Sequence, residues 1–315
     1  MKSLNEIADI LKSKNCVYIL THQYPDGDTL GSAYGLCRAL QALGKKAKVM
    51  YSGEIADKYK FMQEYVDEEE FTPEYIMSVD VAALKLIGDN LSEYKDNISL
   101  CIDHHVSNEN YADVTFVDAM ASATAEVIYN LILEFGLEID KKIAECLYVG
   151  IATDTGCFKH SNVTARTHLI TAELIGKNID LERLNKNLFV MKSKKMLNLE
   201  RMIYDNLQYH FDDRCALIKI TKEMLDKCGL SDGNIDGVSS IPKCIEGVEI
   251  GLTFREKSEN LYKVSVRTVG EINAMNICKQ HGGGGHIHAA GCEVTGSFEE
   301  AKEKILNTIK RQLGW

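Results

Sequence analysis

The sequence CVYILTHQYPDGDTLGS, residues 16–32, carries the clearest indication of architecture in this chain. Its first five residues form a short continuous apolar run, which is typical of a strand buried on both faces of a parallel sheet. His22, Asp26 and Asp28 follow, around a proline and a glycine that favour a tight turn. Because open parallel sheets bind ligands at the carboxyl ends of their strands, this stretch predicts an α/β fold with ionisable groups at that edge.

Strand-like and helical stretches continue to alternate after this point. Apolar runs predict further strands at residues 47–51, 75–79, 99–103 and 114–117. Helical periodicity is present over residues 30–43, 124–135, 141–153, 165–176 and 181–189. Strands that alternate with helices in this way indicate βαβ units and a parallel sheet.

The hydrophobic pattern changes to a period of two after Phe211. Apolar and polar residues alternate over 248–254 and 262–266, which predicts an antiparallel pair of strands, and a helix is expected over 298–309. The predicted organisation is an N-terminal, mostly parallel-sheet domain, a helical connector and a smaller α/β domain with a mixed sheet, at residues 1–189, 190–209 and 210–315.

Composition limits the classes of function. The chain has 315 residues, of which 45% are hydrophobic and 26% charged, as in ordinary globular proteins. Its 36 basic and 46 acidic residues give a formal net charge of −10. Binding of long nucleic acid depends on dense lysine and arginine, so the surface as a whole is not suited to it. A short phosphate ester could still be bound locally if metal ions supplied positive charge.

The cysteines and the N-terminus indicate a cytoplasmic protein. None of the ten cysteines stands in a C-x-x-C pair, which removes the usual zinc signature. We see no signal peptide among the first fifteen residues and no apolar stretch long enough to cross a membrane. No membrane association is therefore expected. The oligomeric state stays open, a homodimer being one alternative.

Acidic residues end several of the predicted apolar segments. Asp80 follows the strand at 75–79, Asp103 is followed by His104 and His105, and Asp154 ends a hydrophobic helical segment. Each such aspartate, like Asp26 and Asp28, could instead cap a helix or shape a turn. So many carboxylates at one sheet edge would repel one another, and divalent cations would remove that repulsion.

Together these motifs resemble the DHH phosphoesterase family over nearly the whole chain. The motifs are H-x-x-P-D-x-D-x-x-G-S at His22–Ser32, the lone Asp80, D-H-H-x-x-N at Asp103–Asn108, Asp154, and G-G-G-H-x-x-A-A-G at Gly283–Gly291. The last of these is similar to the DHHA1 domain that accompanies the catalytic domain. In size and layout the chain is most similar to the branch that contains nano-RNases (short oligoribonucleases) and pAp phosphatases.

The resemblance implies two Mn²⁺ ions per chain, with Mg²⁺ or Co²⁺ as alternatives. By the family pattern, the first ion is held by His22, Asp26 and Asp80. The second is held by Asp28, Asp80, His104 and Asp154, so that Asp80 bridges the two. Imidazole and carboxylate ligands without thiolates favour manganese over zinc.

The resemblance also implies roles for residues that do not bind metal. Asp103 would orient a ligand imidazole, and His105 would contact the substrate phosphate or deliver a proton to the leaving oxygen. A buried histidine bonded to backbone is the alternative for His105.

In the second domain, the family's phosphate-binding group corresponds to Arg267, Gly283, Gly284, Gly285 and His286. Glycines allow backbone N–H groups to approach an anion closely, and a guanidinium can hold a phosphate through two bonds. The alternatives are a flexible glycine turn and a solvated surface arginine.

The expected activity is Mn²⁺-dependent hydrolysis of short oligoribonucleotides, linear dinucleotides such as pApA or pGpG, and the 3′-phosphate of pAp. The alternatives are another phosphohydrolase of the same family, such as a pyrophosphatase, exopolyphosphatase or cyclic-dinucleotide phosphodiesterase, and a non-catalytic nucleotide-binding module.

Overall fold

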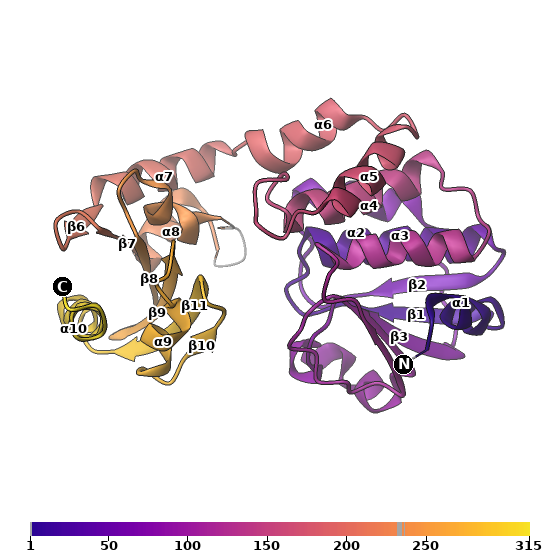
Figure 1. Ribbon diagram of the computed structural model, residues 1–315, viewed down its shortest axis with the longest axis horizontal. Helices are drawn as coiled ribbons and strands as arrows, with labels where there is room; N and C mark the ends of the chain where they lie inside the picture. The colour runs from indigo at the N-terminus through magenta and orange to yellow at the C-terminus, as the bar shows by residue number, and fades with distance from the viewer. Residues whose placement is uncertain (1, 232–234, 236) are drawn as a thin grey trace. The chain divides into compact units, whose positions relative to one another are not determined.

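The computed structural model describes residues 2–231, 235 and 237–315. Met1 of the first expected domain, and residues 232–234 and 236 of the second, lie outside the described residues. The chain divides into two compact units, Met1–Met191 and Lys192–Trp315 (Figure 1).

The first unit is built on a five-stranded sheet in which every neighbouring pair is parallel. Its strands are β1 (Cys16–Leu20), β2 (Lys46–Met50), β3 (Tyr75–Val79), β4 (Leu100–Asp103) and β5 (Val114–Val117). They lie in the order β2-β1-β3-β4-β5. From β1 the chain proceeds to β2 on one side and then returns to β3 on the other, so the topological switch point lies between β1 and β3. This is the position at which open α/β sheets bind ligands.

The α-helices of this unit share a core with one face of the sheet. They are α1 (Leu4–Lys12), α2 (Gly27–Ala42), α3 (Thr124–Glu134), α4 (Lys141–Asp154), α5 (Ala165–Ile175) and α6 (Leu181–Asn185). Helices α2 and α3 lie over one face of the sheet, and α4 packs against both (Figure 1). On β1, Val17 and Ile19 belong to the core beneath these helices, whereas Leu20 packs on the other face with Ile87 and Leu91. That second face is covered by the 3₁₀ segments η2 (Leu84–Leu86) and η3 (Asp89–Asn97).

Helices α2 and α4 cross at two glycines. A Cβ atom on Gly31 would lie 2.4 Å from the carbonyl oxygen of Cys146 and 2.8 Å from the nitrogen of Gly150. A Cβ atom on Gly150 would lie 2.9 Å from Oδ1 of Asp28. Only glycine permits such a close approach of the two backbones. The crossing therefore fixes the spacing of the two helices that carry Asp28 and Asp154.

The second unit contains a six-stranded mixed sheet, in the order β10-β11-β9-β8-β7-β6. The strands are β6 (Gln208–His210), β7 (Cys215–Ile220), β8 (Ile250–Ser258), β9 (Leu261–Thr268), β10 (Gly284–Gly285) and β11 (Ala289–Thr295). Strands β7 and β8 pair in parallel, and the other pairs are antiparallel. The predicted α/β class, with one mostly parallel and one mixed sheet, is confirmed.

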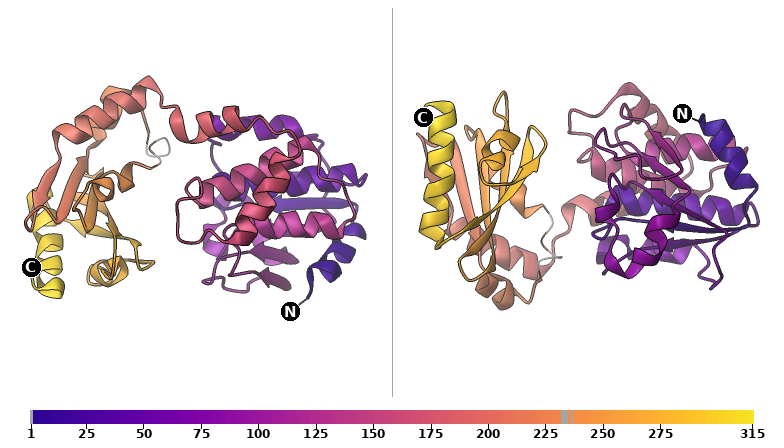
Figure 2. Two further views of the ribbon diagram at one scale, coloured as in Figure 1. Left: turned by 45° about the horizontal axis from the view of Figure 1, so that its top comes forward. Right: turned by 90° about the horizontal axis from the view of Figure 1, so that it is seen from below.

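Helices cover both faces of this second sheet. They are α7 (Lys194–Asp205), α8 (Lys222–Cys228), α9 (Ala274–Lys279) and α10 (Phe298–Leu313). Alternation along β7 sends Leu217 into the core with α9 and α10, and Ile218 into the core with α7 and α8. Figure 2 shows α10 lying along one face of the sheet. Strand β6 begins at Gln208, inside the range in which the sequence predicts a helical connector, because that connector helix already ends at Asp205.

All ten cysteines are free thiols. Within residues 2–231, 235 and 237–315, no helix has the length and apolar character needed to cross a bilayer.

Candidate functional site

The turn after β1 places three ionisable side chains at the N-terminus of α2. Asp26 is the N-cap of this helix, and its Oδ1 accepts hydrogen bonds from the backbone nitrogens of Asp28 and Thr29, both at 3.1 Å. The capping role that its position in the sequence allows is therefore real. Asp28 lies in the first turn and is buried, and its carboxylate faces the N-terminus of α3.

Helix α3 directs its first backbone N–H groups at Asp28. The nitrogen of Thr124 donates to Oδ2 of Asp28 at 2.6 Å, and that of Ala125 donates to Oδ1 at 2.9 Å. A helix N-terminus carries partial positive charge, so this arrangement stabilises a carboxylate there. Ser32 adds a third donor, its Oγ lying 3.3 Å from Oδ1.

Asp80 occupies the end of β3 with an unusual backbone. Its φ is +57°, in the left-handed region that costs a non-glycine residue of the order of 1 kcal/mol. The hydroxyl of Thr29 donates to Oδ2 at 2.5 Å, and that of Thr124 donates to Oδ1 at 2.9 Å. Two hydroxyls from different helices thus fix the orientation of a buried carboxylate.

The end of β4 supplies Asp103 and the two histidines after it. Asp103 is fully buried, and its Oδ1 accepts from the backbone nitrogen of His104 at 2.8 Å and of His105 at 3.2 Å. Its ring partner is His105, whose Nδ1 lies 2.8 Å from the same oxygen. The ring of His104 has a different anchor, since its Nδ1 lies 3.2 Å from the carbonyl oxygen of Ala121. Asp103 therefore orients His105 and not the expected metal ligand His104.

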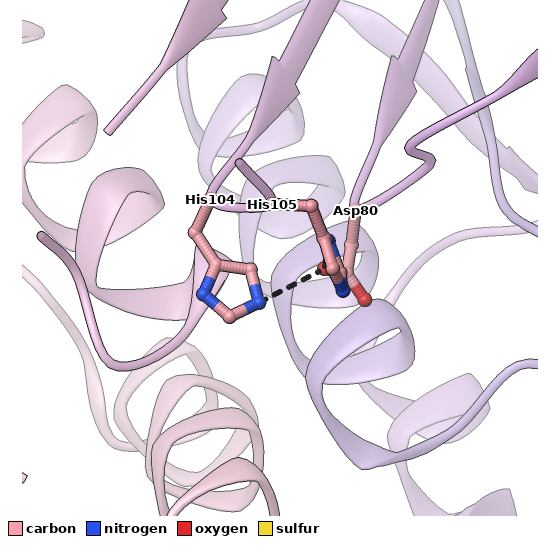
Figure 3. Close-up of side chains that lie close together, drawn as sticks. All are labelled: Asp80, His104 and His105. Atoms are coloured by element: carbon pink, nitrogen blue, oxygen red, sulfur yellow. Dashed lines mark ion pairs between the residues drawn. The ribbon is translucent and has the colours of Figure 1, made fainter. Parts of the chain in front are cut away.

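These side chains converge at the carboxyl edge of the first sheet. Three groups have potential ligand atoms within 4.8 Å of one another: Asp80, His104 and His105; His22, Asp26 and Asp80; and Asp28, His104 and Asp154. Figure 3 shows the first group, with both imidazole rings beside the carboxylate of Asp80. Nε2 of His104 lies 3.5 Å from Asp154, 3.8 Å from Asp80 and 3.9 Å from Asp28. The structure thus brings together all six expected metal ligands, along with His105.

The carboxylates of this cluster are hard to ionise without a cation. Burial, together with the charge of neighbouring aspartates, raises the pKa of Asp80 far above its ordinary value. Burial raises the pKa of Asp28 despite the nearby ring of His104. For Asp154, burial followed by the charges of Asp28 and Asp26 raises the pKa to about 8. A site of this kind favours either protons or metal cations.

Three residues for which the sequence analysis gives no individual role complete the site. Thr29 and Thr124 hold Asp80, and Asn108 holds Asp103 through a 2.6 Å bond from Nδ2 to Oδ2. Asn108 belongs to the D-H-H-x-x-N motif, so its spacing could have identified it. Nothing in the local sequence of Thr124 indicates that a helix N-terminus from residue 124 reaches a strand end near residue 80.

In the second unit, the five expected phosphate-binding residues line one hollow of about 700 Å³: Arg267, Gly283, Gly284, Gly285 and His286. Arg267 lies near the end of β9, and its Nη2 donates to Oγ of Ser239 at 3.4 Å. Burial lowers the pKa of Arg267.

The glycine run has a structural requirement of its own. A Cβ atom on Gly283 would lie 2.2 Å from the carbonyl oxygen of Gly291, and Gly285 has a φ of +141°. The tight hairpin between β10 and β11 thus requires glycine at positions 283 and 285. His281 and His288, which had no expected role, contact the hydroxyls of Thr308 and Thr268 at 3.0 and 3.3 Å.

Comparison with known proteins agrees with both units. Residues 16–151 match the sequence profile of the DHH family, N-terminal domain, and residues 218–314 match that of the DHHA1 domain. A protein of Thermus thermophilus named bifunctional oligoribonuclease and PAP phosphatase NrnA is 31% identical over 98% of this chain and 93% of its own length. The protein of the same name from Bacillus subtilis is 27% identical over 97% of each chain.

Solved structures give the same result for the fold. The crystal structure of an exopolyphosphatase-related protein from Bacteroides fragilis has a TM-score of 0.84 and 28% identity, covering 98% of this chain and 95% of its own. The crystal structure of exonuclease RecJ bound to manganese has a TM-score of 0.57 at 15% identity, covering 98% of this chain and 95% of that one, a likeness of fold alone.

Proposed function

The chain belongs to the DHH family and carries a DHHA1 domain, and from this membership we propose that it hydrolyses short oligoribonucleotides and pAp. The substrates would include linear dinucleotides such as pApA and pGpG, cleaved to mononucleotides, and the 3′-phosphate of pAp. The near full-length similarity to proteins named oligoribonuclease and PAP phosphatase supports this choice among phosphoester hydrolases.

One observation carries the proposal: three overlapping groups of carboxylates and imidazoles share Asp80 and His104 at the sheet's carboxyl edge. Among the residues that the structure describes, Asp28 and Asp80 form ion pairs with histidine rings only. Buried acidic groups without lysine or arginine partners are stable in ionised form only when cations compensate them. The donor set therefore fits divalent metal ions.

We assign the ligands as the family pattern does. His22, Asp26 and Asp80 would hold one ion, and Asp80 would bridge to a second. The ligands of that second ion would be Asp28, Asp80, His104 and Asp154. Oxygen and imidazole donors without thiolates suit Mn²⁺, with Mg²⁺ or Co²⁺ as alternatives. A bound pair of such ions supplies Lewis acidity, which activates water and stabilises the oxygens of an in-line displacement at phosphorus.

The protein's own groups then serve the proton and the substrate. Asp103 holds Nδ1 of His105, which leaves Nε2 of that ring as the atom that can face the phosphate or deliver a proton to the leaving oxygen. Asp103 itself, held by Asn108 and two backbone nitrogens, stays ionised and keeps the ring in place.

A second anion-binding group is proposed in the DHHA1 domain. The guanidinium of Arg267 and the backbone of Gly283–Gly285 line the same hollow, and His286 lies beside them. Such a site suits a terminal or neighbouring phosphate of the substrate. Short ligands are also in keeping with the net negative charge of the chain.

A panel assay tests the proposal. The protein is freed of metal with EDTA, and pApA, pAp and a thirty-nucleotide RNA are offered with Mn²⁺, Mg²⁺ or Co²⁺ in turn. We expect metal-dependent release of AMP from pApA and of phosphate from pAp, and slow cleavage of the long RNA. Equal rates on two and thirty nucleotides would contradict the preference for short substrates, and no turnover of any ester would leave a binding module.

A second candidate is hydrolysis of phosphoanhydrides. It is favoured by the similarity to a structure described as exopolyphosphatase-related. Pyrophosphate and polyphosphate belong in the same panel for this reason. Faster turnover of either one than of pApA and pAp would favour this second candidate.

A further inference from the structure

The three most exposed large apolar side chains in the described part of the chain belong to segments that carry or contact the proposed metal ligands. We call these ligands the metal-ligand cluster: His22, Asp26, Asp28, Asp80, His104 and Asp154. Val106 is 86% exposed, Tyr24 79% and Met120 77%, whereas the remaining exposed large apolar residues reach 68% at most. We call these three residues the apolar rim. Single exposed apolar residues are common on protein surfaces and need no explanation, whereas several of them at one site indicate a binding surface.

Each residue of the rim is a close sequence neighbour of a residue in the cluster or of a residue that contacts it. Tyr24 lies between His22 and Asp26, and its nitrogen donates to Nδ1 of His22 at 3.3 Å. Val106 directly follows His105. Consecutive Cα atoms are about 3.8 Å apart, so these two side chains start within one or two residues of the expected ligands.

Met120 is connected to the cluster through its neighbour Ala121. It precedes Ala121, whose carbonyl oxygen anchors the ring of His104 at 3.2 Å, and its own nitrogen donates to Oδ1 of Asp118 at 3.0 Å. The rim thus comprises the loops after β1 and β4 and the turn before α3.

Local structure does not explain apolar residues at these positions. All three lie in turns or loops, where polar residues are the usual choice. With more than three quarters of its surface exposed, none of the three contributes appreciably to the core. Apolar side chains next to a strongly polar cluster do, however, suit a ligand in which a charged phosphate lies between two flat, largely apolar rings.

We propose that the apolar rim is the nucleobase-binding part of the site, with Tyr24 as the platform on which a base stacks. The inference rests on the proposed function, since it assumes that the phosphate between two nucleosides lies on the metal-ligand cluster. Val106 and Met120 would contact the ribose or the second base. Stacking on an aromatic ring uses the π-face that every base has, so the rim would bind nucleotides with little preference among bases.

Equilibrium binding tests the rim without requiring turnover. AMP and ribose 5-phosphate carry the same phosphate and differ in the base, so the ratio of their dissociation constants with Mn²⁺ present measures the contribution of the base. We expect the parent protein to prefer AMP, Tyr24→Ala to lose roughly 5- to 100-fold in AMP affinity, and its affinity for ribose 5-phosphate to stay unchanged. Tyr24→Phe, which keeps the ring, should bind AMP like the parent.

Two further variants complete the design. Leu169, which is 68% exposed on α5, supplies the matched control: Leu169→Ala removes a comparable apolar surface and should change neither ligand. A variant with serine at positions 24, 106 and 120 should abolish the preference for AMP. The base-binding role of the rim would be contradicted if the parent bound AMP and ribose 5-phosphate with equal affinity. It would also be contradicted if Tyr24→Ala lost affinity for the two ligands to the same extent.

The same variants separate this inference from the proposed function. If the parent protein cleaves pApA but Tyr24→Ala leaves the KM for pApA unchanged, the base-binding role of the rim is wrong, whereas the proposed oligoribonuclease activity is supported. The parent could instead cleave pyrophosphate and not pApA, yet bind AMP more tightly than ribose 5-phosphate in a way that depends on Tyr24. The base-binding role of the rim would then be supported, and the proposed oligoribonuclease activity would be wrong.

Discussion

Nδ1 of His105 lies 2.8 Å from Oδ1 of Asp103, and this pair joins a partly buried ring to a fully buried carboxylate at the site. Burial alone would lower the pKa of His105, but the hydrogen bond and charge of Asp103 outweigh burial and raise it. Burial of Asp103 is in turn outweighed by its bonds to His105 and Asn108, which lower its pKa. The ring is therefore held in its protonated form over a wider pH range.

Asp103→Asn should uncouple this pair. We expect kcat on pAp to fall roughly 10- to 100-fold, as is usual when the partner that orients a functional histidine is lost. Because Asp103 raises the pKa of His105, its loss should also move the alkaline limb of the kcat profile to lower pH. Measured pH–rate profiles check both effects. Asp113→Asn, at an exposed position on the same unit, is the control, and an unchanged profile in Asp103→Asn would contradict the role.

Asp80→Asn should abolish turnover while leaving the fold intact. Asparagine tolerates the left-handed backbone at this position and keeps the shape of the side chain, but it removes the bridging charge. We expect activity to fall by more than about a hundredfold. The metal-free variant should be at least as stable as the parent at neutral pH, because asparagine replaces a buried carboxyl group whose raised pKa lowers stability above its ordinary pKa. Activity assays and thermal unfolding with EDTA test this, with Asp9→Ala on α1 as control. Activity within tenfold of the parent would refute the bridging assignment.

Without divalent cations, stability should decrease as pH rises. Asp154 has its pKa raised from 3.8 to about 8, chiefly by burial. Between these values the folded state holds a proton that the unfolded state has released, so the free energy of unfolding falls with increasing pH. Melting temperatures in EDTA from pH 5 to 8.5 should show this fall, and Mn²⁺ should oppose it by binding the ionised carboxylates. The fall should be smaller in Asp154→Asn, and an identical slope in parent and variant would count against the assignment.

Arg267→Ala should separate substrate binding from chemistry. We propose that the hollow around Arg267 binds a phosphate that is not cleaved, so KM for pAp should rise more than the rate on an unspecific phosphodiester falls. Arg267→Lys should restore only part of the affinity, since an ammonium cannot make the two parallel bonds of a guanidinium. Steady-state kinetics on both substrates are the measurement, and Arg201→Ala on α7 is the control. Losses of equal size on the two substrates would exclude this role.

The sequence was a good guide to the fold because the decisive elements have simple patterns. The apolar strands at 16–20 and 75–79 are uniform and short, and the alternation over 262–266 could belong only to a strand facing two environments. The boundary of the connector was harder to predict, since the helix ends at Asp205 and three residues later a short edge strand begins. Edge strands this short have too few residues to show a period.

The convergence of these carboxylates and imidazoles could be predicted because they follow or end apolar segments, a signal visible in the sequence. The groups that orient them could not. Thr29 and Thr124 hold Asp80 from two different helices, and their partnership depends on how α2 and α3 pack on the sheet. Likewise, the choice of His105 over His104 as the partner of Asp103 depends on ring rotamers, which spacing in sequence does not specify.

The crossing of α2 and α4 bears on how this protein can evolve. Gly31 and Gly150 stand where a single added methyl group would collide with the opposite helix, and Asp28 and Asp154 lie one turn away on the same two helices. A replacement at either glycine would thus be selected against twice, once for lost stability and once for lost chemistry. A larger residue at one glycine could be tolerated only if the opposite helix changed as well. Substitutions should therefore accumulate more slowly at Gly31 and Gly150 than at solvent-exposed positions of the same helices.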